Sequence, residues 1–137
     1  MNLYSTIVFL HVITAILGLG PLTVLALGCS RPAPVPIPWD RLAQLLRLIA
    51  WSLAGMFATG AILIALTHGA LGETKWVRAS FGLFLVLGAL HGVARRQLRK
   101  LRNASPPPAR LSGLAVIFAS MCAVTAAITY LMEAKPW

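Results

Sequence analysis

Hydrophobic residues dominate the chain in four long runs, and charged residues are confined to the gaps between them. A helix of about 20 apolar residues crosses the ~30 Å hydrocarbon layer of a bilayer. Three of the runs reach that length directly. The other is shorter, but the methylene stems of its flanking Arg78 and Arg95 extend it toward the lipid headgroups. The runs without Asp, Glu, Lys or Arg are Met1–Ser30, Leu48–Gly72, Ala79–Ala94 and Leu111–Met132.

This pattern predicts an all-α protein, an integral membrane four-helix bundle. We expect spans at about residues 3–29, 42–68, 76–95 and 110–132. They use most of the 137 residues, so residues 1–137 form a single transmembrane domain without a soluble catalytic module. Asp40 and Thr74 are expected to cap the second and third helices. The alternating prolines from Pro32 to Pro38 predict an extended first connector, and the prolines at 106–108 stop the third helix before the last span.

The distribution of cations predicts the orientation of the bundle. Nine of the 12 Lys and Arg residues lie in the first and third gaps, and three lie in the second gap or at the C-terminus. Loops rich in Lys and Arg stay in the cytoplasm. We therefore expect both termini to be periplasmic, in a multi-pass protein of the bacterial inner (cytoplasmic) membrane.

The net charge of +9 does not indicate nucleic-acid binding. A nucleic-acid protein gathers its basic residues on a soluble face, whereas these flank hydrophobic spans and meet anionic lipid. The segment Val93–Asn103 predicts a cytoplasmic extension of the third helix, with Leu98 and Leu101 touching the membrane. The cations expected to contact anionic lipids are Arg95, Arg96, Arg99, Lys100 and Arg102.

Small residues recur at helical spacing in the last two spans and predict close helix contacts. Gly88 and Gly92 form a GxxxG pattern, which lets a neighbouring backbone approach in lipid. The contacts serve either the bundle itself, which we favour, or a homodimer or larger membrane complex. Gly20-Pro21 predicts a kink in the first span. The small residues of the last span are Ala115, Ala119, Ala123 and Ala127.

Histidines carry the candidate chemistry. His11 lies ~12 Å into the first span, on the face that also carries Thr14 and Gly18, and an ionisable group at such a depth is a candidate functional residue. His11 and His91 are candidate haem b ligands, although they lie at different depths. The alternative for His11 is a hydrogen bond to a neighbouring helix. His68, at the outer surface near acidic residues, has no spacing typical of a metal site.

The residues that several other classes of function require are absent from the sequence. No carboxylate lies inside a span, although coupled transporters usually need one. There is no phosphate-binding glycine loop, zinc-protease motif or nucleophile elbow, so we predict no catalytic residues. Cys29 and Cys122 lie at different depths and are expected to remain unpaired.

The opening Phe9-Leu10-His11-Val12, followed by Ala15–Pro21, resembles the first helix of a bacterial family of predicted integral membrane proteins, domain of unknown function 2269. Thr59-Gly60 and Lys75-Trp76 are similar to that family's pattern too. The family more distantly resembles copper-resistance D (CopD) proteins and HemJ-type protoporphyrinogen oxidase. The resemblance implies that His11 is a haem ligand. It does not extend to the oxidase's further ligand or to its catalytic lysine, because the lysines here lie outside the runs.

Two hypotheses follow from the sequence. The first is a small inner-membrane accessory or structural subunit without autonomous catalysis, in which His11 is a hydrogen-bonding residue. The second is a b-type haem-binding redox protein, in which His11 is an axial ligand and His91 or a second subunit completes the site. A visible haem spectrum distinguishes them.

Overall fold

Four long helices and one short helical turn make up the fold. The structure is a computed structural model that describes residues 2–31, 37–106 and 111–134, and this part of the chain contains no strand. The helices are α1 (Leu3–Cys29), α2 (Trp39–Leu66), α3 (Ala70–Glu73), α4 (Lys75–Arg102) and α5 (Ser112–Ala134). All but α3 are long and apolar enough to cross a membrane. The predicted all-α architecture with four membrane-length helices is confirmed.

The helix ends differ from the predicted ones in several places. The second helix begins at Trp39, with Pro38 as its N-cap, so Asp40 lies inside the first turn and the predicted cap is wrong. Its carboxylate still lies near the positive end of the helix dipole. Thr74 does occupy the N-cap of α4, but its hydroxyl donates to the carbonyl oxygen of Leu71 at 2.6 Å instead of capping the helix.

The sequence pattern also missed α3. The backbone reverses direction after α2 because His68 and Gly69 adopt positive φ angles of 50° and 85°. Glycine adopts this left-handed conformation without steric cost. The reversal makes room for one turn of helix before α4 begins. The prolines at 32–36 and the charged C-terminal Lys135 lie outside the described residues.

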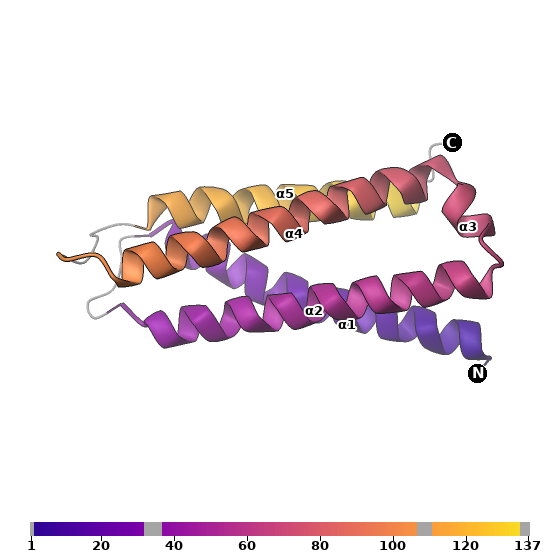
Figure 1. The fold of residues 1–137 in the computed structure, drawn as a ribbon, viewed down its shortest axis with the longest axis horizontal. Coiled ribbons are helices and arrows are strands. Elements are labelled where there is room, and N and C mark those ends of the chain that lie inside the picture. The colour runs from indigo at the N-terminus through magenta and orange to yellow at the C-terminus, as the bar shows by residue number, and fades with distance from the viewer. Residues whose placement is uncertain (1, 32–36, 107–110, 135–137) are drawn as a thin grey trace.

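The long helices alternate in direction and form a four-sided bundle (Figure 1). Around it, α1 packs against α2 and α5, and α4 packs against α5. The fourth side is loose, because α2 and α4 contact each other much less than the other neighbours do. The start of α1, the end of α5 and α3 lie together at one end, the α3 end. The C-terminus of α4 lies at the other end, the basic end.

The tightly packed core lies between the middle of the bundle and the basic end. It combines the second half of α1, the first half of α2, the second half of α4 and the first half of α5. Toward the α3 end, only Ser80 and Ile128 are buried among the described residues. The two halves of the bundle therefore differ, with a dense half at the basic end and a looser half at the α3 end. The largest fully buried side chains are Phe118, Leu25, Leu46, Leu114, Met121 and Cys29.

Ala115 is half-buried and packs against the core, but the other predicted small residues of the last two long helices do not close the bundle, contrary to the favoured prediction. Gly88 and Gly92 are exposed, with no atom near the position that a Cβ would take. Ala119, Ala123 and Ala127 are exposed too. Larger side chains on the opposite faces of these helices fill the core. The predicted GxxxG contact is therefore not made within one chain.

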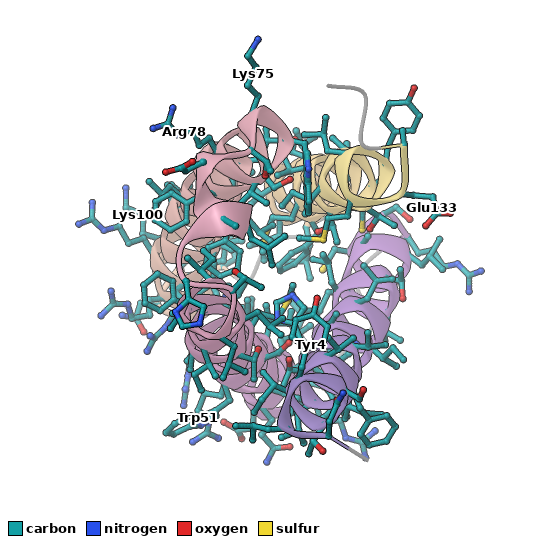
Figure 2. All side chains as sticks on the ribbon, turned by 90° about the vertical axis from the view of Figure 1, so that its right-hand side faces the viewer. Tyr4, Trp51, Lys75, Arg78, Lys100 and Glu133 are labelled. Carbon is teal, nitrogen blue, oxygen red and sulfur yellow. The ribbon has the colours of Figure 1, made fainter. Side chains whose placement is uncertain are left out.

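The predicted extension of the third long helix is present, because α4 continues to Arg102. The proposed membrane contact of Leu98 is wrong, however. Leu98 is buried in the core and Leu101 packs against it. The basic side chains nearby are exposed, and Arg102 lies 3.9 Å from Asp40 of α2 in an exposed ion pair that adds little stability. Lys100 points away from the bundle (Figure 2).

Candidate functional site

His11 joins α1 to α2 by a hydrogen bond in the α3 half of the bundle. Its Nδ1 atom lies 2.7 Å from Oγ1 of Thr59. Thr59 donates its hydroxyl hydrogen to the carbonyl oxygen of Gly55, one turn earlier in α2, at 2.7 Å. The sequence-based alternative in which His11 bonds to a neighbouring helix is thus present in the structure.

We infer the tautomer of His11 from the hydrogen bonds of Thr59. The hydroxyl group of Thr59 has a single hydrogen, which it donates to Gly55, so its oxygen accepts a hydrogen bond from Nδ1–H of His11. In this neutral form Nε2 carries the lone pair and acts as an acceptor or a metal ligand. A protein oxygen on Nδ1–H is also the arrangement that orients metal-binding histidines. His11 therefore retains a usable nitrogen after joining the two helices.

Close backbone packing accompanies this bond along the α1–α2 interface. The Ser52 hydroxyl donates to the carbonyl oxygen of Thr14. A Cβ at Gly18 would overlap Oγ of Ser52, and a Cβ at Gly55 would lie 2.8 Å from Cγ2 of Thr14. The two helices approach so closely because both positions are glycine, which is the usual means of helix association in lipid.

A cavity of about 390 Å³ occupies the α3 half, where the core is loose. All five helices contribute to its walls, and His11 is one of the lining residues. Its volume falls in the range of small-molecule sites. Phe57 of α2 packs against Phe81 and Phe84 of α4, with ring centroids 6.3 and 6.4 Å apart. These three rings also line the cavity and connect its walls across the loose α2–α4 side.

Few polar groups line this apolar cavity. None of the described residues that line it is Asp, Glu, Lys or Arg. Ser80 of α4 is only 5% exposed, and its hydroxyl has no hydrogen-bond partner within the described part of the chain. Tyr4 also lines the cavity and lies between the helices, whereas Lys75 and Arg78 point outward (Figure 2). The cavity thus combines apolar walls with His11, Ser80 and a few aromatic polar atoms.

His91, the other predicted haem ligand, lies elsewhere. It is 7% exposed and on the core face of α4, and neither ring nitrogen has a hydrogen-bond partner among the described residues. It does not line the cavity that His11 lines. The structure therefore does not bring His11 and His91 together at one site within a chain.

The remaining metal-binding side chains are scattered. His68 lies exposed in the turn after α2. Within residues 2–31, 37–106 and 111–134, no three His, Cys, Asp or Glu side chains are close enough to hold a metal ion. Cys29 is buried, Cys122 is half-buried, and both are free, as predicted.

Sequence reasoning found His11 but missed its partner Thr59 and the buried hydroxyl of Ser80. Both are single hydroxyl residues in apolar runs, and no spacing rule distinguishes them from Thr or Ser residues that bond only to their own helix. Thr125, for example, donates to the carbonyl oxygen of Met121 in the preceding turn of α5. Comparison of the chain with models of protein families, with curated proteins and with solved structures gives no match.

Proposed function

We propose that this chain is an accessory or structural subunit of the bacterial inner membrane, without autonomous catalysis. Its four long apolar helices cross the bilayer, with the basic end in the cytoplasm and the α3 end outside. The exposed cations of α4 then lie at the level of anionic lipid headgroups. The exposed small-residue faces of α4 and α5 support association with a second copy or a larger membrane complex.

The observation that carries this proposal is that polar side chains join α1 and α2 by hydrogen bonds. The His11–Thr59 and Ser52–Thr14 pairs each bond one helix to the other. Such bonds hold helices in register in a solvent that offers no competing partners. The principal ionisable group in the membrane region is thereby explained as an element of helix association.

The second candidate is a b-type haem protein, with His11 as an axial ligand. The position of His11, with Nδ1 hydrogen-bonded and the ring lining an apolar cavity, favours this candidate. Haem would supply one-electron chemistry. The fit is incomplete, because the described lining residues include one histidine and no Lys or Arg to pair with the propionates. A second subunit would have to provide the missing groups.

Visible spectroscopy of the purified protein tests both candidates. The protein is expressed with ample haem, purified in mild detergent, and examined oxidised and dithionite-reduced, with a pyridine haemochrome assay. The accessory function predicts no stoichiometric haem and a His11→Ala variant with only modestly reduced stability. A stoichiometric b-type spectrum that disappears in His11→Ala would overturn it in favour of the haem protein. Proteins that purify together with the colourless chain then identify the complex it serves.

A further inference from the structure

The basic half of the bundle is densely packed and the α3 half is loosely packed, which indicates that the cavity has a function. Helices in lipid associate through close packing, so the loosely packed α3 half lacks stabilising contacts that the basic half makes. The sole buried residues described in the α3 half, Ser80 and Ile128, both line the cavity. The space is therefore a defined site within a folded bundle.

The hydroxyl of Ser80 points to a ligand. A buried hydroxyl in a helix normally donates to a carbonyl oxygen in the preceding turn, as Thr59 and Thr67 do here. Ser80 makes no such bond to any described residue and is 5% exposed. A buried polar group without a hydrogen-bond partner lowers the stability of the fold, and alanine at this position would avoid that loss. A ligand oxygen in the cavity would satisfy this hydroxyl.

Nε2 of His11 supplies the complementary group. With Nδ1–H directed at Thr59, Nε2 is an acceptor and suits a ligand that donates a hydrogen. His11 lies eight residues from the start of α1 and Ser80 five from the start of α4, or about 12 and 8 Å along their own helices. The two residues line the same cavity from two different helices. A single hydroxyl group on a ligand both donates and accepts, so it matches this pair.

The walls of the cavity indicate the remaining chemical features of the ligand. Their aromatic side chains favour stacking with a flat ring, and the thioethers of Met56 and Met132 adapt to its edge. The lack of charged residues among the described lining residues favours a neutral molecule. The loose α2–α4 side, where Phe57 and Phe81 are exposed, faces the hydrocarbon phase and suits entry from lipid.

We propose that the cavity binds a neutral, lipid-soluble aromatic alcohol of the phenol or hydroquinone class, whose hydroxyl donates to Nε2 of His11 and accepts from Ser80. The site is independent of the accessory role, but it excludes haem at His11, because Nε2 cannot bind iron and accept a hydrogen bond at once.

Two matched probes test the proposal with the purified full-length protein in detergent. The probe 4-hexylphenol has the required hydroxyl, and 4-hexylanisole replaces its hydrogen with a methyl group. Affinities are obtained from the rise in unfolding temperature during titration. The wild-type protein should bind the phenol about tenfold more tightly than the ether, as one net hydrogen bond provides.

The variants separate binding from folding. Ser80→Ala should unfold at the same or a higher temperature without ligand, yet bind the phenol three- to tenfold more weakly. His11→Phe should abolish the preference for the phenol. Ser120→Ala is the control, because that hydroxyl bonds to Val116 in α5 and does not line the cavity. Equal affinity of the wild type for both probes, or undiminished phenol binding by Ser80→Ala, would overturn the proposal.

Discussion

Oγ of Ser52, on α2, occupies the space that a Cβ atom would need at Gly18 on α1. The same hydroxyl donates to the carbonyl oxygen of Thr14, one turn before Gly18. Close approach and hydrogen bonding therefore depend on each other at this crossing. A side chain at position 18 would remove both, because it would displace the hydroxyl that makes the bond.

Gly18→Ala is therefore expected to lower the free energy of unfolding by about 1–3 kcal/mol, the usual cost of overpacking a tight contact. The measurement is an SDS titration in mixed micelles, followed by circular dichroism. Gly28→Ala is the matched control, because it lies on the same helix, with no atom within 4 Å of the added Cβ and no proline after it. Alanine is the better helix former, so this control should be neutral or stabilising. Similar losses in both variants would contradict the α1–α2 packing.

Thr59→Val tests the hydrogen bond to His11. Valine has nearly the same shape but leaves Nδ1–H without its oxygen partner. Interhelical hydrogen bonds in membrane proteins contribute on average about 0.6 kcal/mol and at most about 1.7. We expect a loss in that range in the same SDS titration. Thr129→Val on α5 serves as the control, since its hydroxyl donates only to Thr125 of its own helix. An equal loss in the control would mean that the His11 bond contributes nothing.

The number and approximate length of the four long helices followed from the sequence because charge is excluded from a hydrocarbon layer wherever a helix crosses it. That single rule located the spans to within a few residues, apart from the basic continuation of α4. It says nothing about which face of a helix turns inward. In lipid both faces are apolar, so Ala119, Ala123 and Ala127 of α5 and the Gly88–Gly92 pair were assigned to the bundle although they are exposed.

The candidate site was only partly predictable for a related reason. His11 stood out because imidazole is rare in a span. The role of Ser80 follows from its lack of a hydrogen-bond partner among the described residues, and the cavity follows from loose packing between α2 and α4. Neither feature leaves a periodic pattern in the sequence. Likewise α3 depends on two positive φ angles, and the first of them belongs to His68, although positive φ is uncommon outside glycine.

The proposed orientation is tested by labelling from outside the cell. Cys29 and Cys122 are first replaced by alanine, and single cysteines are then introduced as Glu73→Cys or Lys100→Cys, both at exposed positions. A membrane-impermeant maleimide applied to spheroplasts should label position 73 and leave position 100 unlabelled until the membrane is permeabilised. The reverse pattern would show that the basic end faces outward, against the positive-inside rule.

Replacing His91 is expected to change the free energy of unfolding in the opposite direction to replacing His11. Its two ring nitrogens are buried without a partner among the described residues, so the fold bears the cost of their lost hydration. His91→Leu should therefore raise the free energy of unfolding by about 1–3 kcal/mol in the SDS titration. His11→Leu removes a bonded imidazole and should lower it. A destabilised His91→Leu variant would indicate that the ring is held by a partner in the membrane, such as a second subunit or a cofactor, and would direct the search for haem from His11 to His91.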